Sequence, residues 1–294
     1  MRIFPLYYGV LFLAALCSPE LRSIFWVYFT YTTNLLISWR WDGVGQGIPL
    51  GPFWSLAVEE QFYILWPAVV LLVPLRRLQA VMLATIALSI VIGFLILKLT
   101  MNEMSYYVFT LSCTDSLAMG GLIALLRSDG ERSRSLEKPA RVCLVGGLIL
   151  LGICIYLRSK GLFWAPRKIA VNVACTLLFA WLIHRAADGF GGIPGRFLRA
   201  KPLRYIGSIS YGIYVSHASL PLLLTGVTQA TGLELKMPDS LGVFRLGSEL
   251  GICIGVASVS WFAYEKPLND LKRYFPYTRR KASSAVIVWS SPLV

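Results

Sequence analysis

The chain has 294 residues, of which 56% are hydrophobic and 15% are charged, and its formal net charge is +13. Its apolar residues come in blocks that are too long and too frequent for one packed core, which excludes an ordinary soluble domain. The basic residues lie between these blocks and act as topology signals, so the positive charge does not indicate nucleic acid as a partner. We predict an all-α fold, a polytopic bundle of transmembrane helices in a lipid bilayer.

The chain opens with two short apolar blocks, at residues 3–17 and 24–38. The second block is rich in aromatic and hydroxyl residues and has only about 15 residues, whereas a membrane-spanning helix needs about 20. We therefore expect residues 24–38 to be re-entrant or interfacial and not to cross the bilayer. The loop from Asp42 to Gly51 is rich in glycine and is predicted to be irregular.

Seven longer blocks follow, and the loops that join them alternate in charge. The blocks lie at about 55–74, 80–97, 106–126, 142–157, 168–184, 204–224 and 241–263. Basic residues cluster after the first, third, fifth and seventh blocks, and the positive-inside rule places these loops in the cytoplasm. With residues 3–17 we predict eight membrane spans, or nine if 24–38 also crosses. We assign residues 1–275 to one membrane domain and 276–294 to a short, poorly ordered tail.

The most unusual stretch is Gly51–Pro67, which reads GPFWSLAVEEQFYILWP. Here Glu59, Glu60 and Gln61 run directly into an apolar block. A charge inside a bilayer is costly and usually faces a cavity or a partner. Successive helical residues are about 100° apart, so the two glutamates cannot share one position. One could line a site while the other takes a structural partner.

A simpler interpretation of the same stretch concerns the start of a helix. Pro52 suits a helix entrance, Ser55 can cap it, and acidic residues in a first turn favour the helix dipole. On this interpretation the glutamates mark only a helix end at the membrane surface.

Cysteine and histidine residues give no metal-binding pattern. The six cysteines lie in apolar blocks without a CxxC pair, so we predict no disulfide framework, no metal and no bound cofactor. His184 lies at a predicted cytoplasmic helix end and is interpreted as interfacial. His217 lies inside an apolar block, where an ionisable residue is a functional candidate. The alternative is a neutral histidine that bonds to a neighbouring hydroxyl or carbonyl group. Ser210 and Tyr214 share its helix face.

Three segments resemble motifs of the integral-membrane acyltransferase family 3, bacterial enzymes that O-acylate O-antigens, exopolysaccharides and nodulation factors. The first is WSLxVEEQFYxLWP at residues 54–67. The second contains Ile209, Ser210, Tyr211, Tyr214, His217 and Pro221, and the third is Glu265-x-Pro267 with the basic residues that follow. The resemblance covers nearly the whole chain, about residues 2–275.

The resemblance implies a multi-pass enzyme of the bacterial inner membrane that transfers an acyl group, most often acetyl, from cytoplasmic acyl-CoA. The acceptor would be a hydroxyl of a surface carbohydrate, a lipid-linked glycan or a glycolipid. Acyl transfer needs a general base and stabilisation of the tetrahedral intermediate. We expect Glu59 or Glu60 and His217 to be catalytic. We expect substrate binding by Trp54, Ser55, Gln61, Tyr63, Tyr211 and Tyr214, with Arg2 meeting the CoA phosphates.

The chain departs from the family pattern in two places. The family usually has an arginine two residues before Asp115, where this chain has Cys113. Arg2-Ile3-x-Pro5 resembles the end of a basic segment that, in the family, follows two membrane helices, the first with an essential histidine. We therefore expect the 294-residue chain to lack these helices and to be inactive alone, through either a mis-started gene model or a true truncation.

Two other classes of function remain open. A transporter or flippase could use Glu59, Glu60 and His217 as a proton relay. Such folds often contain inverted repeats, and the sequence has no second Glu-Glu motif, which argues against this class. A non-catalytic remnant of the family is the third alternative. Substrate-dependent release of CoA separates the enzyme from both.

Overall fold

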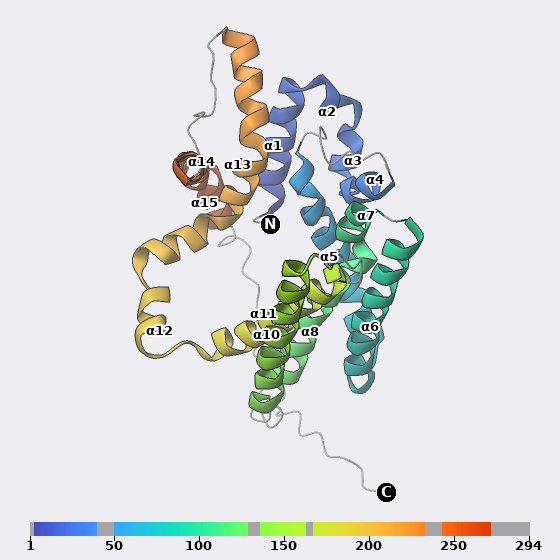
Figure 1. Ribbon diagram of the computed structural model, residues 1–294. Coiled ribbons are helices and arrows are strands. Elements are labelled where there is room, and N and C mark those ends of the chain that lie inside the picture. The colour runs from blue at the N-terminus through green and yellow to red at the C-terminus, as the bar shows by residue number, and fades with distance from the viewer. Residues whose placement is uncertain are drawn as a thin grey trace, which may run out of the picture.

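The computed structural model describes residues 3–39, 50–100, 102–128, 136–162, 167–232 and 243–271. Every regular element in these ranges is a helix, which confirms the predicted all-α class. Figure 1 shows α1 and α13 side by side on one flank of the molecule, while α8, α10 and α11 form a separate group. Arg2 and residues 276–294 lie outside the described residues, so the expectations for Arg2 and for the tail stay predictions.

The elements of the first half lie between residues 3 and 128. They are α1 (Ile3–Cys17), α2 (Pro19–Ser23), α3 (Phe25–Phe29), α4 (Thr33–Trp39), the 3-10 turn η1 (Gly51–Phe53), α5 (Trp54–Leu72), α6 (Leu75–Thr100), α7 (Glu103–Val108), the 3-10 turn η2 (Thr110–Ser112) and α8 (Thr114–Ser128).

The second half holds longer helices. They are α10 (Glu137–Ser159), α11 (Arg167–Asp188), α12 (Gly192–Leu198), α13 (Lys201–Thr231), α14 (Val243–Ser260), the π-helical turn η3 (Trp261–Glu265) and α15 (Lys266–Asp270).

Four segments of the described chain are long and apolar enough to cross a membrane. They are Gly51–Leu72, Leu75–Thr100, Glu137–Ser159 and Arg167–Asp188, and α1 is a shorter apolar helix. With the family evidence given below, these segments identify a multi-pass membrane protein. The count of eight spans stays a prediction.

Two predicted blocks are broken in the structure. Residues 24–38 form the two short helices α3 and α4, neither of which is long enough to cross a bilayer. The block predicted as a span at 106–126 is not continuous, because α7 ends at Val108 and α8 begins at Thr114. Polar side chains satisfy the carbonyl groups released at this break. The Ser112 hydroxyl donates to the carbonyl groups of Tyr106 (2.6 Å) and Phe109 (2.7 Å), and the Asn34 amide donates to that of Val108 (3.2 Å).

Aromatic side chains of α1, α3 and η1 form the centre of the main core. Tyr7, Tyr28 and Phe53 are fully buried, and Val215 brings α13 into the same cluster. The Tyr7 hydroxyl donates to the carbonyl of Tyr28 at 2.8 Å, so burial of this phenol leaves no lost hydrogen bond. This core holds the start of α5 against α1 and α13.

A second packing centre joins α5, α6 and α8. Met82 of α6 and Leu122 of α8 are buried together, with Trp66 of α5 packed against them. A Cβ atom added at Gly121 of α8 would lie 3.0 Å from the Trp66 ring, so glycine permits this close approach. The first core thus holds the start of α5, and the second contacts it further along through Trp66.

Candidate functional site

The start of α5 is built by a tight turn. Leu50 adopts a left-handed conformation (φ 56°), the turn η1 follows, and α5 begins at Trp54. The prediction that Ser55 caps the helix is wrong. Its hydroxyl lies 3.4 Å from the Pro52 carbonyl and also bonds to the Tyr214 hydroxyl of α13. The reason is that η1 already continues the helical path into α5, so Ser55 sits inside the first turn, where its side chain faces α13.

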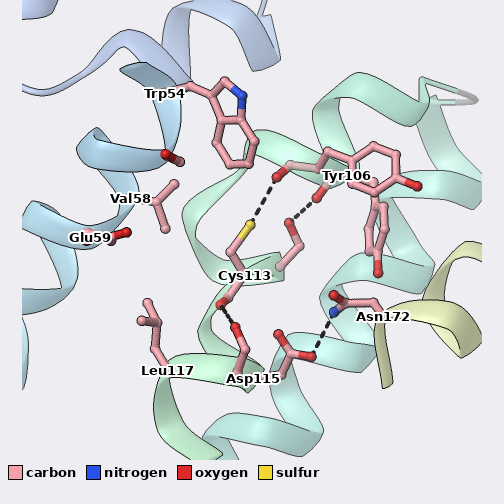
Figure 2. Close-up of a pocket in the computed structure, with 12 residues that line it drawn as sticks. Trp54, Val58, Glu59, Tyr106, Cys113, Asp115, Leu117 and Asn172 are labelled. Atoms are coloured by element: carbon pink, nitrogen blue, oxygen red, sulfur yellow. Dashed lines mark hydrogen bonds between the residues drawn. The ribbon is translucent and has the colours of Figure 1, made fainter. Parts of the chain in front are cut away.

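A cavity of about 270 Å³ lies between α5, the α7–α8 segment and α11. Its lining combines carboxylate, amide, hydroxyl and aromatic groups, from Trp54, Ser55, Val58, Glu59, Tyr106, Tyr107, Ser112, Cys113, Asp115, Ser116, Leu117 and Asn172. Figure 2 shows Trp54 and Glu59 on the α5 side and Asp115 and Asn172 on the opposite side. None of these twelve residues is basic. The cavity therefore presents two carboxylates without a cation in its own wall.

The two adjacent glutamates occupy different environments, as helix geometry predicts. Glu59 is partly buried and lines the cavity. Glu60 is buried and faces the tyrosine side of the main core, where Tyr7, Tyr31 and Tyr211 lie within electrostatic range of it. Glu59 is therefore the carboxylate that a molecule in the cavity would meet.

Asp115 is the second carboxylate of the cavity wall, and its side chain is only partly satisfied. It lies in the first turn of α8, where the helix dipole favours a negative charge, and the residue is 2% exposed. Its Oδ2 atom accepts a hydrogen bond from the Asn172 amide at 2.8 Å and one from the Thr176 hydroxyl at 3.5 Å. Its Oδ1 atom is buried and accepts no hydrogen bond from the described residues.

Gln61 belongs to a polar network that ties α5 to α4 and η2. Its amide nitrogen donates to the Tyr31 carbonyl (2.7 Å) and to the Asn34 side-chain oxygen (2.9 Å), and its oxygen accepts from the Thr110 hydroxyl. The Asn34 amide in turn donates to Thr110 Oγ1 at 2.7 Å. Both ends of the Gln61 amide are thus occupied, and Gln61 does not line the cavity. Its expected role in substrate binding stays a prediction.

Ser55, Tyr214 and His217 form a polar chain between α5 and α13. The Tyr214 hydroxyl reaches both Ser55 Oγ and the Pro52 carbonyl, the latter at 2.6 Å. The exposed His217 ring packs edge-on against Tyr214, with ring centroids 5.1 Å apart, and its Nδ1 contacts the Tyr214 carbonyl at 2.5 Å. A carbonyl only accepts hydrogen bonds, so Nδ1 carries a proton, and in the neutral ring Nε2 keeps a lone pair.

The remaining predicted residues lie around this centre. Tyr211 is half-buried and lies within electrostatic range of Glu59, Glu60 and Glu265. Tyr63 is 50% exposed and does not line the cavity. Of the residues expected at the site, the structure therefore brings Trp54, Ser55 and Glu59 to the cavity and places the α13 residues beside it.

His184 lies near the C-terminal end of α11, at the other end of this helix from the cavity residue Asn172, in a cluster of charged groups. Its Nε2 atom is 4.0 Å from carboxylate oxygens of both Glu137 and Asp188. A guanidinium group only donates, so the 3.1 Å contact of Arg127 with His184 Nδ1 leaves the ring proton on Nε2. A metal-bound histidine needs the reverse arrangement, with a free nitrogen toward the ion and an N–H group on the other side. The cluster therefore suits an ion-pair network, which the 2.5 Å contact between Arg127 and Asp188 completes.

Sequence reasoning did not select the far wall of the cavity. Asp115 and Cys113 attracted attention only through the family motif, and Asn172 was not considered. An amide inside a predicted membrane helix is a usable signal, because such groups usually bond to a neighbouring helix. The break between α7 and α8, which brings Tyr106 and Cys113 to the cavity, has no clear pattern in an apolar block.

Comparisons with known proteins identify the family of the chain. A family model for an acyltransferase domain, acyltransferase family 3, matches residues 1–265. The chain belongs to this family. It is 26% identical over 265 residues to the putative peptidoglycan O-acetyltransferase YrhL of Bacillus subtilis, a match that covers 86% of this chain and 40% of YrhL.

Further relatives of this acyltransferase family 3 chain carry similar names. Peptidoglycan O-acetyltransferase OatA of Listeria monocytogenes is 27% identical over 252 residues, covering 80% of this chain and 38% of OatA. O-acetyltransferase OatA of Staphylococcus aureus is 26% identical over 183 residues, covering 58% of this chain and 29% of the relative. The chain thus spans about two fifths of the length of the first two relatives. No solved structure matches the chain.

Proposed function

We propose that the protein is a membrane O-acetyltransferase that acetylates a hydroxyl of a cell-wall carbohydrate. The observation that carries the proposal is the carboxylate of Glu59 in an aromatic cavity, in a chain of acyltransferase family 3. The names of the relatives, which describe peptidoglycan O-acetyltransferases, support the substrate class. Lipid-linked glycans and glycolipids are further acceptors with the same hydroxyl chemistry.

In the proposed reaction Glu59 acts as the general base. It takes the proton of the acceptor hydroxyl while the hydroxyl oxygen attacks the acetyl carbonyl carbon of acetyl-CoA. A C–O bond forms, the C–S bond breaks, and the CoA thiolate leaves and takes up a proton. The Ser55 hydroxyl, which lines the cavity and is held by Tyr214 of α13, is the donor that would stabilise the negative oxygen of the tetrahedral intermediate. His217, with its free Nε2, is a second group that would hold or pass a proton.

The position of the basic residues supports binding of the acceptor from the non-cytoplasmic side of the membrane. Arg127 lies at the end of α8 opposite to Asp115, about 18 Å away along the helix axis at 1.5 Å per residue. If the basic ends are cytoplasmic, the cavity opens in the outer half of the bilayer, where cell-wall glycan is made accessible. The acetyl group of cytoplasmic acetyl-CoA would then reach Glu59 from the inner half, and Arg2 would meet the CoA phosphates.

The proposal is tested in the organism that encodes the chain. The gene is deleted and then restored, either as the wild type or as Glu59→Gln, and ester-linked acetate is released from purified cell-wall glycan with mild base and quantified. We expect acetate to fall on deletion and to return only with the wild-type gene. Unchanged acetate after deletion would refute the proposal. Acceptor-dependent release of CoA from acetyl-CoA in the same membranes distinguishes a transferase from a transporter.

A further inference from the structure

The far wall of the cavity contains a carboxylate oxygen that lacks a donor. Asp115 is 2% exposed, and Asn172 and Thr176 both donate to Oδ2, whereas Oδ1 is buried and accepts nothing from the described residues. An ionised carboxyl group can only accept hydrogen bonds, and a buried acceptor without a donor costs free energy. Figure 2 shows the Asp115 carboxyl group at the cavity, with Asn172 holding it from the side of α11.

The setting of Asp115 is rigid. Its own backbone N–H donates to the Ser89 hydroxyl of α6 at 3.2 Å, so α6, α8 and α11 all meet at this residue. The donors on Oδ2 fix the plane of the carboxyl group and therefore the direction of Oδ1. A site that is pre-organised in this way loses little entropy when a ligand supplies the missing donor.

The chemistry of the wall identifies the kind of ligand. The cavity has two carboxylates and no basic residue in its lining, which disfavours the phosphates of a nucleotide. Trp54, Tyr106 and Tyr107 offer flat apolar faces in the same space. A neutral sugar has both features that this wall would match, namely hydroxyl donors along its edge and apolar C–H groups on its faces.

We propose that Asp115, held by Asn172, is the anchor for a hydroxyl group of the acceptor sugar and faces Glu59 across the cavity. This rests on the proposed O-acetyltransferase function and assigns the acceptor subsite within it. The sugar hydroxyl donates its hydrogen bond to Oδ1, and a neighbouring hydroxyl of the same sugar is thereby presented to Glu59. Asp115 takes no part in proton transfer, so it is a specificity-determining residue.

Binding and transfer are measured separately, with membranes of the protein expressed from its complete reading frame, an N-acetylglucosamine tetramer as the acceptor probe and acetyl-CoA as the donor. Asp115→Asn replaces the accepting oxygen while keeping the shape of the side chain. Cys113→Leu fills the cavity without replacing Asp115, and Cys143→Leu, which makes the same change on α10 outside the cavity lining, is its control. Cys113 suits this test because its side chain lines the cavity and donates a hydrogen bond to the Tyr107 carbonyl, at 3.1 Å.

We expect Asp115→Asn and Cys113→Leu to weaken binding of the radiolabelled tetramer and to raise its KM roughly tenfold to a hundredfold, as loss of a hydrogen bond to a charged group does. The KM for acetyl-CoA stays within about twofold, and Cys143→Leu behaves as the wild type. Equal tetramer binding by all variants, with transfer intact, would overturn the anchor and leave the proposed function standing. A rise in the KM for acetyl-CoA alone would assign this wall of the cavity to binding of the acetyl donor. That result would also overturn the anchor role of Asp115. A wild-type protein that neither binds the tetramer nor releases CoA would overturn both.

Discussion

At the scale of single residues, neighbours in sequence have separate roles because a helix turns them apart. Glu59 lines the cavity and Glu60 is buried against the tyrosine core, although the two are adjacent in the chain. Gln61 points in a third direction, into the network with Asn34 and Thr110. The motif thus places one carboxylate at the cavity, a second one in the core, and an amide in the network that ties α5 to α4 and η2.

This separation predicts different effects of two similar substitutions. Glu59→Gln removes the proposed base and should lower acetyl transfer by roughly a hundredfold to ten-thousandfold, while the protein remains folded. Glu60→Gln keeps the volume of the side chain and should largely preserve transfer in the protein that folds. Rates are measured as CoA release in membranes and normalised to the amount of folded protein. If Glu60→Gln alone abolishes transfer, the base lies on the tyrosine side and our assignment of Glu59 is wrong.

His217 gives a second prediction at this scale. His217→Ala should reduce transfer roughly tenfold to a thousandfold if Nε2 handles a proton. His217→Asn is the informative comparison, because its amide can still donate to the Tyr214 carbonyl but cannot take up a proton. We expect both variants to be impaired in the CoA-release assay. Full activity of the asparagine variant would show that His217 only positions Tyr214.

At the scale of helices, close contacts depend on small residues. A Cβ atom added at Gly226 of α13 would overlap the Cβ and Sγ atoms of Cys17 at the end of α1. Another glycine of the same helix, Gly207, has open space around its Cα atom. Both positions lie within the same helix, so the same substitution meets a crowded site at Gly226 and an open site at Gly207.

Substitution of either glycine by alanine should therefore change the free energy of unfolding, but in opposite directions. Gly226→Ala should lower the free energy of unfolding by about 1–3 kcal/mol, because α1 and α13 must move apart. Gly207→Ala should raise it by about 0.5–1 kcal/mol through its better helix propensity. Thermal unfolding in lipid nanodiscs, followed by circular dichroism, compares the variants with the wild type. Equal midpoints for both variants would contradict the packing of α1 on α13.

The helices were easier to predict than the site they form. Long apolar blocks such as 80–97 and 168–184 identified α6 and α11, because the cost of exposing backbone groups to lipid leaves few alternatives to a helix. The break at Phe109–Cys113 was missed, because the side chains of Asn34 on α4 and of Ser112 within the break satisfy the carbonyl groups that it releases. The cavity depends on that break and on Asn172 of a distant helix, so the motif at 54–67 revealed only its near wall.

At the scale of the whole molecule, the basic ends of several helices meet on one side. Arg127 of α8 contacts Asp188 of α11, and Arg185 of α11 contacts Glu137 of α10 at 3.1 Å. Leu78 near the start of α6 is buried with Leu122 of α8, which brings Arg76 and Arg77 to the same end. These contacts agree with the predicted grouping of the basic loops, whereas the direction of that end relative to the membrane stays a prediction.

Cysteine labelling in intact cells determines this direction. In a background without the six native cysteines, single cysteines are placed at Ser128 and Arg196 on the basic side, and at Ser159 and Thr231 at the far ends of α10 and α13. The positive-inside rule predicts that a membrane-impermeant maleimide labels the residue-159 and residue-231 variants but reaches the other two only after the cells are opened. Each variant must first retain wild-type CoA release, which shows that the fold survives.

Labelling of the residue-128 variant in intact cells would reverse the orientation and place the cavity of Glu59 and Asp115 in the cytoplasmic half of the bilayer. Acetylation of an extracytoplasmic glycan would then require the acceptor to cross the membrane first, so the orientation decides on which side of the bilayer the proposed reaction takes place.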